Sequence, residues 1–98
     1  MKWTIRLLPE ARAEFDNSAD WYEDNRTGLG VEFVANVRNV FNRIAANPKL
    51  HAVTYRDVRK AVVAKFPFVV IYREEIDVVL IISVFHTSQD PAIWEKRV

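Results

Sequence analysis

Apolar and polar residues alternate with a period of two at the start of the chain, over Lys2 to Leu8. Trp3, Ile5 and Leu7 fall on one side of this segment. The alternation predicts a strand with one buried face. Pro9 follows directly, and a helix can begin there because the first N–H of a helix has no partner within it.

The hydrophobic period then changes to that of a helix. A first apolar stripe consists of Ala11, Phe15, Ala19 and Tyr22. This helix is predicted to stop before "RTGLG", where Gly28 and Gly30 are the only two glycines of the chain. They mark a turn or a helix end that needs unusual backbone angles.

A second helical stripe begins directly after the glycine turn. It consists of Leu29, Phe33, Val37, Val40 and Ile44, with Arg38 and Arg43 off the stripe. The segment "NPKL" is predicted to end this helix because Pro48 cannot continue it. A short connection between two helices that each have one apolar face predicts an antiparallel helical hairpin.

The remainder of the chain has the composition of a sheet. Three segments rich in β-branched and aromatic residues are predicted to be strands: Val58 to Phe66, Phe68 to Glu74 and Val78 to His86. The short polar turn "EEID" predicts that the second and third form a hairpin. The third is apolar on both faces and should therefore be central.

A short helix is predicted at the C-terminus, with Asp90 as its cap and Pro91 in its first turn. The element order predicts an α+β fold in a single domain over residues 1–98. The fold is predicted to begin with an N-terminal strand, followed by an antiparallel helical hairpin. The hairpin packs on one face of a mainly antiparallel sheet of about four strands, and the short helix comes last. The other sheet face is left for function or for a partner.

Composition narrows the possible classes of protein. The 98 residues include no cysteine and two histidines, His51 and His86, so we expect no disulfide, no metal site and no cofactor. The N-terminus is too charged for a signal peptide. The most apolar run, Val78 to Phe85, is far shorter than a membrane span. We therefore expect a cytoplasmic protein without a membrane partner.

The net charge of +1 conceals a segregation of charge along the chain. Residues 1–34 carry four basic and seven acidic side chains, residues 35–73 carry eight basic and one acidic, and residues 74–98 carry two basic and five acidic. The basic middle is either a solvated sheet rim or an anion-binding face for nucleic acid or an acidic protein. Its cluster Arg56, Arg59, Lys60 and Lys65 favours recognition of phosphate or an acidic segment. Without a bulge, Arg59 and Lys65 share one strand face and Lys60 points the other way.

Several motifs together resemble one family. The run "Y…GLG…F" from Tyr22 to Phe33 is followed by "NP" at Asn47, then by "DVRKAVVAKFPFVVIYR" from Asp57 and "VFHTSQDPAIWEKR" from Val84. In order and spacing these resemble the RelE/ParE superfamily of type II toxin–antitoxin toxins, and specifically the ParE-like branch often labelled plasmid stabilisation proteins. The resemblance implies a toxin that inhibits growth and is held inactive by a cognate antitoxin, in a possible hetero-oligomer.

Within that superfamily, RelE-type members cut messenger RNA on the ribosome and ParE-type members are associated with poisoning DNA gyrase. RelE-type cleavage uses lysines and arginines on the sheet face and a C-terminal tyrosine. The resemblance places Lys60 at one lysine position, but it places Val62, Val69 and Thr87 at other basic positions. Trp94 stands near the tyrosine position, and its indole cannot shuttle a proton at neutral pH. This departure removes most of the ribonuclease machinery.

The stretch "HTSQDP" raises a last possibility for catalysis. His86 has an ordinary pKa near neutrality and could act with Lys65 and Arg73 as a substitute site. We favour a structural role, in which the ring packs at the strand end and bonds to a turn carbonyl or Asp90. Weak catalytic candidates are therefore Lys60, Lys65, Arg73 and His86. Candidates for partner or anion binding are Arg56, Arg59, Lys60, Lys65, Gln89, Trp94 and Arg97.

Three functions stay open from the sequence. The favoured one is a toxin that binds and inhibits DNA gyrase without hydrolytic chemistry. The alternatives are a ribosome-dependent endoribonuclease and an inactive family member that only binds its antitoxin.

Overall fold

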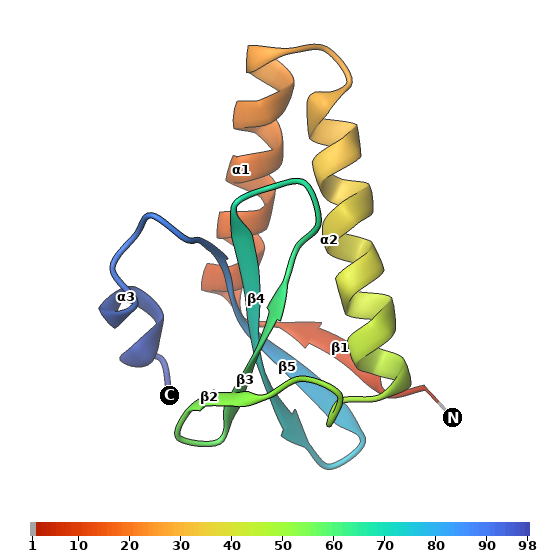
Figure 1. Ribbon diagram of the computed structural model, residues 1–98, viewed down its shortest axis with the longest axis vertical. Helices are drawn as coiled ribbons and strands as arrows, with labels where there is room; N and C mark the ends of the chain where they lie inside the picture. The colour runs from red at the N-terminus through yellow and green to blue at the C-terminus, as the bar shows by residue number, and fades with distance from the viewer. Residues whose placement is uncertain (1) are drawn as a thin grey trace.

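The computed structural model of the protein describes residues 2–98. Its elements follow in the order β1 (Thr4–Leu7), α1 (Pro9–Asn25), α2 (Leu29–Ala46), β2 (Val53–Tyr55), β3 (Val58–Val62), β4 (Phe68–Glu75), β5 (Val78–His86) and α3 (Ala92–Glu95). The predicted α+β class is confirmed. Figure 1 shows the two long helices standing side by side as a hairpin, with the sheet beneath them and α3 set apart near the C-terminus.

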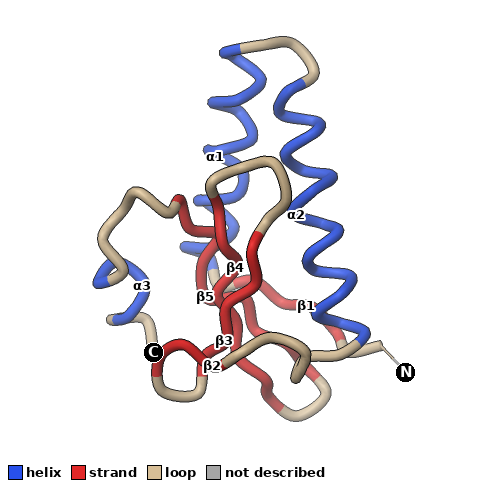
Figure 2. Tube along the Cα trace, viewed as in Figure 1, coloured by secondary structure: helices blue, strands red, loops and turns tan. Residues whose placement is uncertain are grey.

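The five strands form one sheet in the order β1-β5-β4-β3-β2. β1 runs parallel to β5, and the other neighbours are antiparallel. β5 therefore has a strand on each side, as its two apolar faces predicted. The hairpin of β4 and β5 is also confirmed. The sheet has one strand more than the sequence pattern indicated, because β2 is only three residues long and largely exposed. Figure 2 shows it as a short red segment between loops.

The helical hairpin turns at a glycine, as predicted. Gly28 has a φ of +89°, which an L side chain rarely adopts. Gly30 differs from the prediction, since it lies inside α2 and has no positive φ. A Cβ at Gly30 would lie 2.5 Å from the carbonyl oxygen of Ala19, so this glycine permits the close approach of the two helices.

The first turn of α2 is capped by a side chain from α1. Glu23 accepts hydrogen bonds from the backbone N–H groups of Gly28, at 2.8 Å, and Gly30, at 3.0 Å. The bond from Gly28 is the main cause that lowers the pKa of the Glu23 carboxyl. The carboxylate thereby satisfies N–H groups that have no partner within α2.

Two hydrophobic cores lie on opposite faces of the sheet. Alternation along β4 explains them: Phe68, Val70 and Tyr72 face the helical hairpin, whereas Val69 and Ile71 face the other way. The hairpin-side core also contains Phe15, Phe33, Val37, Val40, Phe41 and Ile44. The smaller core on the opposite face contains Val58, Ile82, Phe85 and Trp94. Both faces are therefore partly covered, and α3 supplies the cover on the second face.

Two boundaries differ from the sequence prediction in ways that affect the site. β3 ends at Val62 rather than Phe66, and Lys65 lies in the following turn with a φ of +68°. Arg59 and Lys65 therefore do not share a strand face. At the other end, α3 begins at Ala92 with Pro91 as its N-cap and without a side-chain cap, whereas the sequence predicted Asp90 as the cap. Asp90 Oδ1 instead accepts the backbone N–H of Ala92, at 3.0 Å, in the turn before the helix.

Candidate functional site

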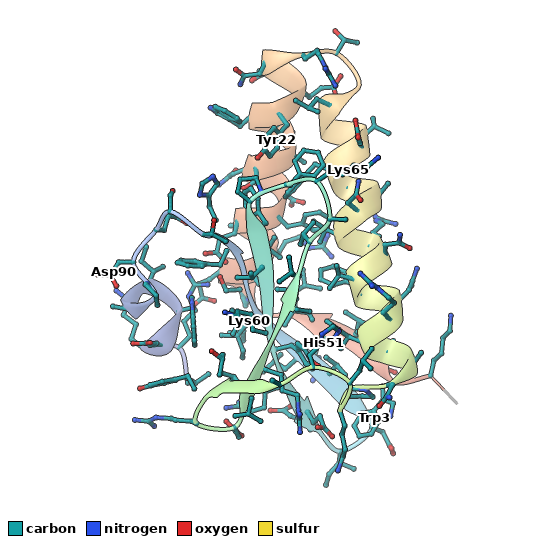
Figure 3. The ribbon with its side chains drawn as sticks, in the orientation of Figure 1. Trp3, Tyr22, His51, Lys60, Lys65 and Asp90 are labelled. Atoms are coloured by element: carbon teal, nitrogen blue, oxygen red, sulfur yellow. The ribbon has the colours of Figure 1, made fainter. Side chains whose placement is uncertain are left out.

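The sheet face opposite the helical hairpin, termed here the open face, brings together the positions that the RelE resemblance singled out. A groove of about 270 Å³ on this face is lined by Thr54, Tyr55, Lys60, Val69, Ile71, Phe85, Thr87, Pro91, Trp94 and Glu95. Val62 lies one alternation beyond Lys60 on the same strand and is 67% exposed. Figure 3 shows Lys60 over the middle of the sheet, away from Lys65 at the tip of the β3–β4 hairpin.

The chemistry of the open face is limited by its side chains. Among residues 2–98, Lys60 is the single cation that lines the groove, and no histidine lines it. Proton transfer and stabilisation of a charged phosphorane need at least an acid, a base and further cationic donors. An apolar groove with one lysine and one glutamate suits contact with a protein surface better than phosphoryl chemistry.

Trp94 anchors the C-terminal helix rather than standing free. It is buried, and its ring meets Tyr55 edge-on with centroids 5.8 Å apart. Contact between Trp94 and a partner stays a prediction. Such a contact would require α3 to move or the partner to reach only the rim of the indole.

Arg97, another predicted contact for a partner, is engaged within the protein. Its guanidinium forms an ion pair with Glu14 of α1, with Nη1 2.9 Å from Oε1, and also donates to the carbonyl of Ile82 at 3.0 Å. The same Glu14 oxygen accepts from the Ser83 hydroxyl at 2.8 Å and from the Val84 N–H at 3.2 Å. This network, which no sequence pattern predicted, ties the C-terminus to α1 and β5.

The remaining basic candidates are dispersed. Arg59 donates to the carbonyl of His51 at 2.7 Å and pairs with Glu74 at 3.3 Å. Lys65 lies 3.8 Å from a carboxylate of α2, and Arg73 pairs with its strand neighbour two residues on at 3.4 Å. Arg56 lies in the β2–β3 turn, with its guanidinium 5.4 Å from the ring centre of Tyr55. The structure thus does not gather these side chains into one anion site.

His86 lines a different cavity from Lys60. This cavity, about 620 Å³, lies between α1 and the end of β5 and is lined by Glu14, Asn17, Ser18, Trp21, Tyr22, Phe68, Val84, His86, Ser88 and Gln89. The imidazole packs edge-on against Phe68, with ring centres 5.0 Å apart. Neither Lys65 nor Arg73 lines this cavity, so the structure does not assemble the substitute site.

One ring nitrogen of His86, Nδ1, forms hydrogen bonds within the turn that follows β5. Nδ1 accepts the backbone N–H of Ser88 at 3.1 Å, and the Ser88 hydroxyl lies 2.7 Å from the same nitrogen. The ring therefore accepts from the turn, where the sequence had suggested donation to a carbonyl or to Asp90.

Two buried polar groups beneath α2 escaped the sequence prediction. The Tyr72 hydroxyl donates to the carbonyl of Pro48 at 2.6 Å, and burial raises the pKa of this phenol. Its neighbour His51 has a buried Nε2 without a hydrogen-bond partner among the described residues. Burial is the main cause that lowers the pKa of this imidazole, and the positive charge of Arg43 is the second. The Tyr72 bond ties the loop after α2 to β4.

None of the helices within residues 2–98 has the length and apolar character of a membrane span. The same residues contain no group of three or more histidine, cysteine, aspartate or glutamate side chains placed to hold a metal ion.

Comparison with known proteins agrees with this architecture. Residues 5–91 match the family model described as the ParE toxin of the type II toxin–antitoxin system parDE. No curated protein sequence matches the chain. A solved structure described as the chromosomal ParDE TA system from P. aeruginosa matches with a TM-score of 0.62 at 13% identity, covering 87% of this chain and 96% of that chain. At this identity the structural match shows a shared fold, whereas the family match spans most of the sequence. The chain belongs to the ParE toxin family of type II toxin–antitoxin systems.

Proposed function

We propose that the protein is the toxin of a type II toxin–antitoxin pair, that a cognate antitoxin neutralises it by direct binding, and that it stops growth by binding and inhibiting DNA gyrase. Family membership supports the toxin and the antitoxin partner. The choice of gyrase follows from the ParE-like resemblance. Under this proposal the protein acts in the cytoplasm as part of a toxin–antitoxin hetero-oligomer.

The composition of the open face supports inhibition of gyrase over cleavage of RNA. Among the described residues, Lys60 is the single cation that lines the groove. The resemblance to RelE-type ribonucleases places their basic groups and proton donor at Val69, Thr87 and Trp94, which supply neither. Inhibition by binding needs no general acid or base, since the energy comes from buried apolar surface and complementary charge. The open face offers such surface, including the exposed side chain of Val62.

A cellular experiment tests the proposal. The toxin is induced alone and together with the small reading frame beside its gene, and growth, chromosome breaks and messenger RNA cleavage are followed in the same cultures. We expect growth arrest with DNA damage, restored growth with the second gene, and intact messenger RNA. Ribosome-dependent cleavage of messenger RNA without DNA damage would favour the endoribonuclease. Normal growth with abundant soluble toxin would favour an inactive, antitoxin-binding protein.

A further inference from the structure

The cavity between α1 and the end of β5, termed here the α1–β5 cavity, has no role in the proposed function. Its volume of about 620 Å³ is more than twice that of the open-face groove, about 270 Å³. Sites for small molecules typically measure roughly 300–1,000 Å³. Figure 1 shows α1 beside the end of β5 and the loop that leads to α3. Trp21 lines the cavity and is 60% exposed, so the cavity is open to a ligand from solvent.

Aromatic rings follow one another along the wall of this cavity. The ring centres of Trp21 and Tyr22 are 5.2 Å apart, and those of Tyr22 and Phe68 are 6.1 Å apart. Phe68 and His86 continue the series at 5.0 Å. The face of an aromatic ring carries a negative partial charge, which attracts a cation that lies over it. The wall therefore suits a ligand with an organic cation.

The charged group of the lining is the carboxylate of Glu14. Its Oε1 accepts from the Ser83 hydroxyl, the Val84 N–H and Nη1 of Arg97, whereas Oε2 accepts from Nη2 of Arg97 alone, at 3.2 Å. An ionised carboxylate has about four lone-pair sites over its two oxygens. Oε2 therefore has room for a further donor, and no lysine or arginine of residues 2–98 lines the cavity to supply it.

The charge of the two segments that build the cavity has mainly one sign. α1 carries six acidic side chains and one basic side chain, Arg12, and residues 84–90 add Asp90 without a lysine or arginine. Seven acidic groups thus face one basic group. Arg97, which holds Glu14 without lining the cavity, offsets one of them. The resulting field attracts small cations and repels anions.

We propose that the α1–β5 cavity binds a small organic cation, in which an ammonium group is joined to an apolar body. The ammonium group donates to Glu14 Oε2 and lies against the ring faces of Trp21 and Tyr22, while the body packs on Phe68 and Val84. This binding site is independent of the proposed inhibition of gyrase.

Other ligand classes fit the same cavity less well. A phosphate or carboxylate ligand finds no cation in the lining and meets Glu14 instead. A neutral ligand covers Oε2 without replacing the hydrogen bond that water gives it, which is costly for a charged group. A metal ion would have one carboxylate, whereas metal sites in proteins use several ligands.

Calorimetric titration with three probes that share an indole-ethyl body tests the proposal. Tryptamine carries an ammonium group, tryptophol a neutral hydroxyl and indolepropionate a carboxylate. We expect tryptamine to bind at least about tenfold more tightly than either of the others. In NMR spectra, tryptamine should shift the indole N–H signal of Trp21 and the side-chain amide of Gln89. The indole signals of Trp3 and Trp94, which lie outside the cavity, should stay in place.

Substitution of an exposed lining residue supplies the second arm. Asn17→Asp adds a carboxylate to the lining and should tighten tryptamine binding by at least about threefold, whereas Asn17→Lys should weaken it by more than about tenfold. Trp21→Ala should weaken it by about fivefold. Val31→Ala, an exposed apolar side chain of α2 outside the cavity, is the control and should bind within about twofold of the wild type. Thermal unfolding shows that each variant is folded.

Several results would overturn the proposal. One is equal affinity for the three probes, or a preference for indolepropionate. Another is tryptamine binding that Asn17→Lys leaves unchanged, or that shifts the signals of Trp3 or Trp94 instead of Trp21. The absence of binding at about 10 mM tryptamine would also overturn it.

Discussion

The network that joins Glu14 to Arg97 makes the C-terminus part of the core, and its removal should destabilise the whole domain. Arg97 donates twice to the carboxylate and once to the carbonyl of Ile82, and the two charged side chains are only 21% and 13% exposed. Arg97→Ala leaves a largely buried carboxylate without its cation. Breaking a fully buried pair costs about 3–5 kcal/mol.

Partial access of solvent reduces that cost, so we expect a loss of about 3 kcal/mol in the free energy of unfolding for Arg97→Ala. For a domain of this size, about 4 °C of Tm per kcal/mol corresponds to a fall of roughly 12 °C. Glu14→Ala should cost a similar amount, because the Ser83 hydroxyl and the Val84 N–H also lose their acceptor. The control Arg26→Ala removes an exposed pair at 3.9 Å and should cost less than about 0.5 kcal/mol.

Urea unfolding of the two single variants and of the double variant measures the coupling. We expect the double variant to be less destabilised than the sum of the single variants by at least about 1 kcal/mol, because the second substitution removes a group that the first has already orphaned. Additive losses, or an Arg97→Ala protein within about 1 kcal/mol of the wild type, would show that the ion pair does not stabilise the domain. Arg97 would then be free to contact a partner.

Three further predictions concern stability. Gly30→Ala should strongly destabilise the fold, since the new Cβ would lie 2.5 Å from a carbonyl oxygen of α1. Gly28→Ala should lower the free energy of unfolding by only about 1 kcal/mol, because of the positive φ at this position. Equal melting temperatures of both variants and the wild type would contradict this. The pKa of His51 is lowered below 6.5 in the folded protein, so the unfolded chain binds a proton at this imidazole more readily. The free energy of unfolding, measured in urea, should therefore fall as the pH drops below 6.5. His51→Gln should make this pH dependence weaker. Arg59→Ala should lower Tm, because it removes the partly buried bonds of Arg59 to the His51 carbonyl and to Glu74. Lys65→Ala, at the exposed hairpin tip, should leave Tm unchanged. A larger fall in Tm for Lys65→Ala than for Arg59→Ala would show that the turn depends on Lys65.

Local patterns predicted most of the fold because each helix and long strand carries its own periodicity. The stripe through Phe33 and Val37 specified the buried face of α2, and Gly28 specified the turn before it. β2 was missed because a strand of three residues, two of them exposed, carries no burial pattern. Lys65 was assigned to the wrong environment because the end of β3 depends on a positive-φ turn, which the sequence does not mark with glycine.

The candidate site was harder to predict because it depends on contacts between distant segments. Glu14 and Arg97 are 83 positions apart, so no spacing rule could pair them. The family resemblance, by contrast, placed Lys60 and Val69 on the sheet face, and alternation along β3 and β4 brings both to the face opposite the helical hairpin.

Under the proposed function, this protein stops growth by binding gyrase and not by cutting RNA. Supercoiling of relaxed plasmid by purified DNA gyrase is measured with increasing amounts of purified toxin, beside a ribosome-dependent RNA cleavage assay with the same preparation. We expect dose-dependent loss of supercoiling, reversal by the antitoxin, and the same inhibition by a folded His86→Ala variant. Unchanged supercoiling together with RNA cleavage that His86→Ala abolishes would contradict it.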